Sequence, residues 1–177
     1  TDVRSIGIGE QYSRVPARLY RPRTVGHRHI CIYGMRQFGV EDQGWVAWFL
    51  IAAVTGRPIT IYGDGKQVRD VLWIDDLLDL YQAAAEDMDT AAGQVYNVGG
   101  GPHNTLAVWT ELGPMLQQLL GRQVPVTRAG WRPGDQRIFV ADIRKAESEL
   151  GWRPRVGKEE GVRRLYEWVL AHQDLFA

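Results

Sequence analysis

Arg69 is the residue whose type and position first suggest binding chemistry. It lies between a short apolar stretch, Ile59–Tyr62, and a helical pattern that begins near Asp75. A guanidinium on a turn beside a helix N-terminus can bind a phosphate group through two parallel N–H donors. The alternative is a weak surface ion pair with Asp70 or Asp64, which is a common arrangement. The residues alone leave both interpretations open.

Three predicted elements position this arginine. The stretch Ile59–Tyr62 is β-branched and aromatic and predicts a strand, and residues 63–66, which include two glycines and an aspartate, predict a turn. The following helix is expected to have Asp75 as its N-cap, with Asp76 near the positive end of the helix dipole. Helical spacing assigns one apolar face to Leu77, Leu78, Leu80, Tyr81 and Ala84.

Besides the segment GDGKQVRDVLWIDDL, which starts at Gly63, three further blocks stand out. They are IYGMRQFG at 32–39 with DQGWV at 42–46, VYNVGG at 95–100, and RPGDQR at 132–137 with GWRP at 151–154. Together the four blocks resemble the C-terminal part of the extended short-chain dehydrogenase/reductases, the NAD-dependent nucleotide-sugar epimerases and dehydratases. The first of the three is similar to a segment of the CDP-paratose 2-epimerases, also called CDP-tyvelose epimerases. Each block alone is weak evidence for this family, but four blocks in the family's order over most of the chain are strong evidence.

The resemblance implies a ligand and the residues that bind it. In this family the arginine matched by Arg69 binds the diphosphate of a sugar nucleotide. Arg132 matches a second arginine on the same diphosphate, and Asp135 matches an aspartate that reaches the nucleotide ribose. Gln37, in the block at 32–39, and Tyr62, directly before the segment that starts at Gly63, complete the expected substrate-binding set. The resemblance therefore implies a CDP-sugar or another nucleotide as the ligand, and it leaves the sugar open.

The family's catalytic residues are not matched in this chain. Counting back from Arg28 along the family's pattern places its catalytic tyrosine at Asp2 and its lysine at Ile6. Neither residue can supply a phenol as general acid and base or an ammonium that lowers the phenol's pKa. The glycine loop for a dinucleotide is also missing, because Gly7-Ile8-Gly9 is not followed by the required strand, turn and helix. The sequence therefore assigns no catalytic, cofactor-binding or metal-binding residue, and NAD is expected only in the full-length family.

The resemblance also implies the fold class and the domains. We expect an α/β fold that corresponds to the C-terminal half of an extended short-chain dehydrogenase/reductase, without the N-terminal dinucleotide-binding half. Residues 1–22 are expected to be a degenerate N-terminal helix region, kinked at Pro16 and disordered or rebuilt at its start. Residues 23–177 are expected to form the epimerase-like domain. A partial sheet leaves edges uncovered, so we expect a homo-oligomer or a separate NAD-binding half as partner.

The remaining pattern predicts three more strands and four more helices. The strands are expected at 23–33, 95–98 and 124–127, the last at a sheet edge because Pro125 has no N–H to donate. Gly56 is expected to end the first helix, and Thr105 and Asp142 are expected to cap the second and third. The helices are expected at 43–55, 106–120, 143–150 and 158–170, and a loop is expected at 131–139.

Composition narrows the classes of protein. The chain has 177 residues, 45% hydrophobic, which is enough for one domain with a core. Its 21 basic and 21 acidic residues give no net charge, which argues against general nucleic-acid binding. The chain has a single cysteine, Cys31, and no signal peptide, which predicts a cytoplasmic protein. It also has no apolar run long enough for a membrane span. His27 and His29 share a strand face but lack further ligands, and Cys31 is interpreted as a small buried hydrophobe.

Two classes of function remain open at this point. The first is a CDP-sugar epimerase-related protein that lacks the NAD-binding half and the catalytic tyrosine and lysine, and is inactive alone. The second is a non-catalytic module that binds a nucleotide or nucleotide sugar, or that serves in assembly. A neighbouring reading frame that encodes the glycine loop and the Tyr-x-x-x-Lys motif would favour the first.

Overall fold

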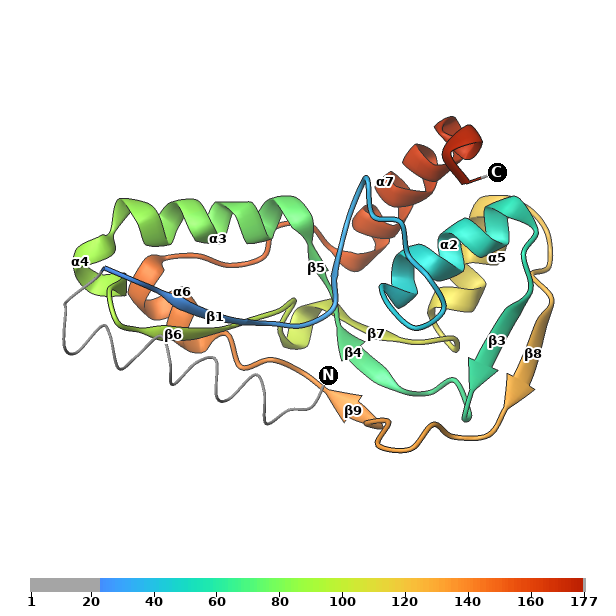
Figure 1. The fold of residues 1–177 in the computed structure, drawn as a ribbon, viewed down its shortest axis with the longest axis horizontal. Coiled ribbons are helices and arrows are strands. Elements are labelled where there is room, and N and C mark those ends of the chain that lie inside the picture. Colours follow the sequence, from blue (N-terminus) through green and yellow to red (C-terminus); the bar gives the residue numbers. More distant parts are fainter. Residues whose placement is uncertain (1–22, 177) are drawn as a thin grey trace.

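The computed structural model describes residues 23–176, so the expected helix region 1–22 lies outside the described residues. Short strands and helices alternate along the chain, which confirms the predicted α/β class (Figure 1). The strands are β1 (Gly26–His29), β2 (Ile32–Tyr33), β3 (Ile59–Tyr62), β4 (Val68–Asp70), β5 (Leu72–Trp73), β6 (Val95–Val98), β7 (Thr105–Ala107), β8 (Val126–Ala129) and β9 (Ile138–Phe139). The helices are α2 (Trp45–Thr55), α3 (Ile74–Glu86), α4 (Met88–Ala91), α5 (Leu112–Leu120), α6 (Arg144–Leu150) and α7 (Lys158–Ala171), with 3₁₀ turns η1 (Pro102–Asn104) and η2 (Gln173–Phe176).

The strands pair in four small sheets. Strand β1 is parallel to β6, β2 is parallel to β5, and β3 is parallel to β8. Strand β4 lies between β7, which is antiparallel to it, and β9, which is parallel to it. Because β4 joins segments far apart in sequence, it brings Arg69 beside the chain that follows β8.

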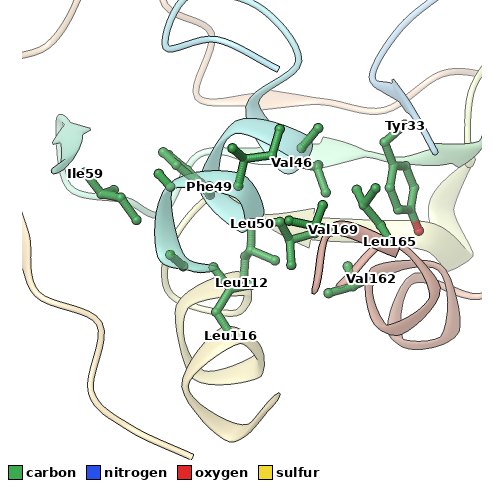
Figure 2. Close-up of a cluster of buried hydrophobic side chains, with 14 of the residues drawn as sticks. Tyr33, Val46, Phe49, Leu50, Ile59, Leu112, Leu116, Val162, Leu165 and Val169 are labelled. Carbon is green, nitrogen blue, oxygen red and sulfur yellow. The ribbon is translucent and has the colours of Figure 1, made fainter. Parts of the chain in front are cut away.

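Two hydrophobic clusters hold the described chain together. Figure 1 shows β1 and β6 with α3, α4 and α6 at one end and α2, α5, β3 and β8 at the other. At the first end the buried residues include Leu80, Tyr96 and Trp152. At the second end α2 is buried on most sides and packs against α5 and α7, as the side chains in Figure 2 show. Helix α2 has only apolar residues and one threonine, which explains why nearly all its faces are covered.

The strand expected at 23–33 is two strands. Cys31 has a left-handed φ of 50°, which breaks the extended chain, so β1 pairs with β6 and β2 pairs with β5. The helix expected at 43–55 begins at Trp45 because Gly44 also takes a left-handed φ of 72°. Its predicted end is confirmed, since Gly56 is a left-handed C-cap whose N–H donates to the Ala52 carbonyl.

The helix expected at 106–120 is wrong in its first part. Residues Thr105–Ala107 form β7 and pair with β4, so Thr105 does not cap a helix. Helix α5 begins at Leu112, and Pro114 lies in its first turn, where a missing N–H costs no helical bond. The Glu111 carboxylate accepts the Ala107 N–H at 2.6 Å and holds the turn between strand and helix.

Other predictions need smaller corrections. Helix α3 begins at Ile74 with Trp73 as N-cap, and the Asp75 carboxylate instead accepts the Trp73 indole N–H at 2.9 Å. Of its expected apolar face, Leu78 and Tyr81 are exposed, because only one side of α3 has a neighbouring sheet. Ile143, not Asp142, precedes α6 as its N-cap. Strand β8 lies two residues later than expected, β9 forms within the expected loop, and α7 closely matches its predicted range.

Candidate functional site

A pocket of about 390 Å³ lies beside the N-terminus of α2, the end of β3 and the loop between β8 and β9. Four of the five predicted substrate-binding residues line it: Arg69, Arg132, Asp135 and Tyr62. Gln37 is not part of the lining. The pocket therefore brings together side chains that lie far apart in the sequence, and its volume is within the range of sites for small organic ligands.

Local structure explains where each of these side chains lies. Tyr62 is the last residue of β3, and Gly63 after it turns the chain with a φ of 73°. Arg69 is the middle residue of β4, in register with Phe139 of β9. Arg132 and Asp135 belong to the loop that connects β8 to β9, so pairing of β9 with β4 carries this loop over Arg69. The site thus depends on tertiary pairing and not on one local motif.

The Arg69 guanidinium is bound by the chain itself. Its Nη1 donates to the Val68 carbonyl at 2.9 Å, and its Nη2 donates to Asp135 Oδ1 at 3.0 Å and to the Gln136 carbonyl at 2.6 Å. The Arg69 side chain is only 13% exposed. Asp70, one of the surface partners considered for Arg69, is instead buried and accepts the Gly101 N–H at 3.0 Å. Arg69 is therefore a largely shielded cation at the pocket wall, with the Asp135 carboxylate as its partner.

Arg132 lies in a more open part of the pocket. Its guanidinium carbon is 3.7 Å from the centre of the Tyr62 ring, a cation–π contact. Its Nη2 is 3.1 Å from Asp42 Oδ1, and the Asp42 side chain is 86% exposed. The Tyr62 hydroxyl donates to Glu41 Oε1 at 2.9 Å. Tyr62 therefore orients the second arginine through its ring and connects β3 to the loop before α2 through its hydroxyl.

Gln37 supports the wall behind the pocket. Its Nε2 donates to the Ile32 carbonyl at 3.2 Å, while its Oε1 is buried without a partner among the described residues. A side chain at Gly44 would come within 3.2 Å of the same Nε2, so Gln37 packs directly under the turn that starts α2. We conclude that Gln37 positions this turn and does not face the pocket.

Sequence reasoning missed several lining residues. Gln67 is 3% exposed, and its Nε2 donates to the Tyr62 carbonyl at 2.7 Å and to Asp135 Oδ2 at 3.2 Å. A signal was present, because Gln67 and Arg69 are two residues apart and alternate residues of a strand share a face. Glu41 and Asp42 were also missed, although Asp42 is the first residue of the DQGWV block and Glu41 directly precedes it. These residues add three polar groups to the site.

Cys31 lines the pocket as well. Burial raises the pKa of its thiol, so the thiol is neutral at pH 7 and a poor nucleophile. Its left-handed backbone is a conformation that asparagine adopts far more readily than cysteine. The interpretation of Cys31 as a small apolar residue stays the simplest one.

Other candidate chemistry lies away from this pocket. His27 and His29 face the same side of β1, with ring centres 6.1 Å apart. Burial lowers the pKa of both imidazoles. Between residues 23 and 176, no group of three or more His, Cys, Asp or Glu side chains is placed to hold a metal ion. Within the same range no helix is long and apolar enough to span a membrane.

One spacing in the chain matches the family's catalytic motif by number alone. Tyr62 and Lys66 are separated by three residues, as in Tyr-x-x-x-Lys. Tyr62 ends a strand and Lys66 follows a turn, so the two side chains are not one turn apart on a helix. The Lys66 N–H is held by Asp64 Oδ1 at 3.0 Å within that turn. The arrangement therefore does not reproduce the phenol and ammonium pair that this chemistry requires.

Comparison with known proteins identifies the family. A family model described as GDP-mannose 4,6 dehydratase matches residues 44–165. The chain therefore belongs to the nucleotide-sugar epimerases and dehydratases of the extended short-chain dehydrogenase/reductase family. Its sequence is 40% identical over 170 residues to CDP-paratose 2-epimerase of Salmonella typhi, an alignment that covers 93% of this chain and 50% of that protein. It is 32% identical to dTDP-glucose 4,6-dehydratase of Neisseria gonorrhoeae over 86% of this chain and 45% of that one.

Solved structures of this epimerase and dehydratase family have the same fold. UDP-glucose 4-epimerase of Thermotoga maritima, solved with UDP-glucose, superposes with a TM-score of 0.82 at 30% identity over 95% of this chain and 52% of that one. UDP-glucuronic acid 4-epimerase of Bacillus cereus, solved with UDP-glucuronic acid and NAD, superposes with a TM-score of 0.78 at 28% identity. This match covers 94% of the present chain and 50% of the Bacillus cereus chain. The chain thus spans about half the length of the relatives it matches, and its α/β fold corresponds to their C-terminal half.

Proposed function

We propose that this chain supplies the nucleotide-sugar-binding part of an NAD-dependent epimerase or dehydratase, with a CDP-sugar as its ligand. The observation that carries the proposal is the meeting of Arg69 and Arg132 at one pocket. Two guanidinium groups at one site suit a diphosphate, because each can bind one phosphate group bidentately. The identity to CDP-paratose 2-epimerase supports cytidine as the nucleoside.

In this proposal the residues of the pocket bind and orient the ligand. Arg69 and Arg132 neutralise the diphosphate, Tyr62 holds Arg132 in place through its ring, and Asp135 accepts hydrogen bonds from ligand hydroxyls. When bound, NAD would supply a hydride acceptor and donor for the sugar. No residue of this chain is assigned to proton transfer, so the described pocket accounts for binding and not for the chemical step.

The described residues do not fit the role of an NAD site. A dinucleotide site of this kind needs a glycine-rich turn that leads from a strand into the N-terminus of a helix. The glycines at 99–101 follow β6 but lead into the short turn η1. A side chain at Gly99 would lie 2.2 Å from Asp70 Oδ2, the oxygen that accepts the Gly101 N–H. These glycines are therefore explained by close packing around a buried carboxylate.

The pocket arginines give the first test. We expect the 177-residue chain to bind CDP with a dissociation constant between about millimolar and tens of micromolar, roughly 4–6 kcal/mol. Arg69→Ala and Arg132→Ala should each weaken binding at least about tenfold, because each removes a charge-assisted contact worth roughly 1.5–3 kcal/mol. Arg69→Lys should also weaken it, since lysine lacks the planar fork. Isothermal titration calorimetry of CDP measures these effects.

A matched control is Arg163→Ala on α7. Arg163 forms an exposed ion pair with Glu167 at 3.4 Å. Its replacement by alanine removes the same positive charge as the pocket variants do, but outside the pocket lining. CDP affinity should be unchanged in this variant. An equal loss of CDP affinity in Arg69→Ala, Arg132→Ala and Arg163→Ala would mean that the total charge of the protein, and not the pocket, governs binding. No detectable CDP binding at millimolar ligand would refute the proposal.

The cofactor gives the second test. We expect the 177-residue chain alone neither to bind NAD nor to convert CDP-sugars, because no described residues fit the dinucleotide and no Tyr-x-x-x-Lys pair is arranged on a helix. Calorimetric titration with NAD and a chromatographic assay of CDP-sugars measure these two properties. A micromolar dissociation constant for NAD would contradict the expectation.

The alternative function is a non-catalytic module that binds a nucleotide or serves in assembly. Strand β1 favours a partner in either case, because among the described residues it pairs only with β6, on one edge. A homo-oligomer or a separate NAD-binding half stays a prediction for that partner, as does the cytoplasmic location. Binding of CDP without any activity after an NAD-binding half is added would favour the alternative.

A further inference from the structure

The pocket that holds the two arginines contains more negative than positive groups. Its lining has Arg69 and Arg132 against the carboxylates of Glu41, Asp42 and Asp135. A pocket for a diphosphate is expected to carry an excess of positive charge, because complementary potentials favour the encounter and avoid like-charge repulsion. The carboxylates already present must therefore move or change partners when an anion binds.

The contact between Asp135 and Arg69 is the most shielded of these interactions. Asp135 Oδ1 accepts from Arg69 Nη2 at 3.0 Å, and Asp135 Oδ2 accepts from Gln67 Nε2 at 3.2 Å. The side chains of Arg69 and Asp135 are 13% and 25% exposed. Both carboxylate oxygens thus accept from donors, Oδ1 from Arg69 of β4 and Oδ2 from Gln67 just before that strand, in the same way that an anionic ligand would.

The second ion pair of the pocket is weaker. Arg132 and Asp42 are 37% and 86% exposed, so water and salt screen their attraction. A phosphate group can replace Asp42 at Arg132 with little loss of interaction energy, because the existing ion pair is weak. At Arg69 the situation differs, because the guanidinium also donates to the Val68 and Gln136 carbonyls. A phosphate that binds Arg69 through two N–H groups has to take the donor that Asp135 now occupies.

We propose that Asp135 is a built-in competing anion that sets the affinity of this pocket for diphosphates. In the chain without ligand its carboxylate occupies the Arg69 guanidinium, and a diphosphate binds by displacing it. The loop between β8 and β9 carries Asp135, so the displacement moves the carboxylate off Arg69 and frees it to accept from ligand hydroxyls. This inference rests on the proposed function of the pocket as a diphosphate site.

The test uses pyrophosphate, the simplest diphosphate, and the variant Asp135→Asn in the 177-residue chain. Asparagine has nearly the same shape but no charge, so it competes less for Arg69. We expect pyrophosphate to bind about tenfold more tightly to the variant than to the wild type, measured by calorimetry. Asp142→Asn is the matched control, because Asp142 also pairs with an arginine, Arg144, but lies outside the pocket lining. Its affinity for pyrophosphate should equal that of the wild type.

A second measurement does not depend on the folding of any variant. Gln67 is 3% exposed and its side-chain amide donates to Asp135, so its NH₂ signals in a nuclear magnetic resonance spectrum report the position of that carboxylate. We expect these signals in the wild type to shift as pyrophosphate saturates the pocket, while the amide signals of exposed Gln82 on α3 stay unchanged. Saturation of the pocket without a shift at Gln67 would overturn the proposal.

The outcomes separate this inference from the function on which it rests. Tighter pyrophosphate binding by Asp135→Asn, with no change for Asp142→Asn, supports the competing role. Equal or weaker binding by Asp135→Asn overturns that role and leaves the diphosphate site intact. Equal gains in both variants also overturn it, because they assign the effect to total charge. No binding by the wild type or by Asp135→Asn overturns the diphosphate site itself and the competing role with it.

Discussion

Replacing Asp76 with alanine is expected to lower the free energy of unfolding by about 2–3 kcal/mol, because it leaves two backbone donors without their acceptor. Asp76 lies in the first turn of α3 and is 2% exposed. Its Oδ1 accepts the Arg155 N–H at 3.1 Å, and its Oδ2 accepts the Val156 N–H at 3.0 Å. One carboxylate thus holds the segment that leads into α7, far away in sequence.

The ionisation of Asp76 modifies this effect. Burial raises the pKa of its carboxyl above the ordinary value of 3.8, and the two N–H donors oppose that rise only in part. A raised pKa in the fold means that the contribution to stability is fully present below pH 3.8 and decreases as the pH rises through the raised pKa. The free energy of unfolding of the wild type should therefore exceed that of Asp76→Ala most at pH values below 3.8. This excess should shrink as the pH rises through the raised pKa, and it should stay positive at pH 7.

Chemical denaturation followed by circular dichroism at two pH values measures this prediction. Asp79→Ala is the matched control, because Asp79 is on the same helix and forms an exposed pair with Arg155 at 3.5 Å. An exposed ion pair contributes about 0–1 kcal/mol, so this variant should be close to wild type. If Asp76→Ala and Asp79→Ala lost the same stability, the two buried hydrogen bonds would not be the cause.

The sequence predicted the parts of the fold that local residues determine. Gly56 ends α2 and Gly63 turns the chain after β3, and both adopt the left-handed backbone that glycine favours. The motif blocks also predicted that Arg69 and Arg132 meet at one pocket, and both arginines line it. That prediction came from the resemblance, since nothing in the spacing of the two residues places them together.

The errors occur where distant segments decide the local structure. Thr105 begins a strand because β4 pairs with it, and a helical pattern in the following residues conceals this. Leu78 and Tyr81 fit a helix face by spacing, but they are 54% and 37% exposed. The contact of Asp135 with Arg69 also depends on β9 joining β4, which no pattern within either segment indicates.

Gly161→Ala is expected to destabilise the fold by about 1–2 kcal/mol, although alanine is normally about 1 kcal/mol better than glycine inside a helix. Gly161 lies on α7 where it meets Tyr33 of β2, and a Cβ there would lie 2.0 Å from the Tyr33 hydroxyl oxygen. Tyr33 is 2% exposed, and its ring packs edge-on against Trp73. Figure 2 shows Tyr33 directed toward Val162 and Leu165 of the same helix, so the ring has little room to withdraw.

Tyr33→Phe separates the steric cause from other effects of the alanine. The Tyr33 hydroxyl is buried without a hydrogen-bond partner among the described residues, so its removal alone should be neutral or slightly stabilising. In the Tyr33→Phe background Gly161→Ala should cost about 1 kcal/mol less than in the wild type, since the nearest clashing atom is gone. Gly157→Ala, at the N-cap of α7, brings the added methyl group only into ordinary contact with Glu159 Oε2 at 3.9 Å and should cost about 0.5 kcal/mol, because alanine is a poorer N-cap than glycine. Thermal melts of the four variants and the wild type measure the cycle. A higher melting temperature for Gly161→Ala in the wild-type background would mean that α7 moves away from Tyr33 at no cost, and that helix propensity alone governs this position.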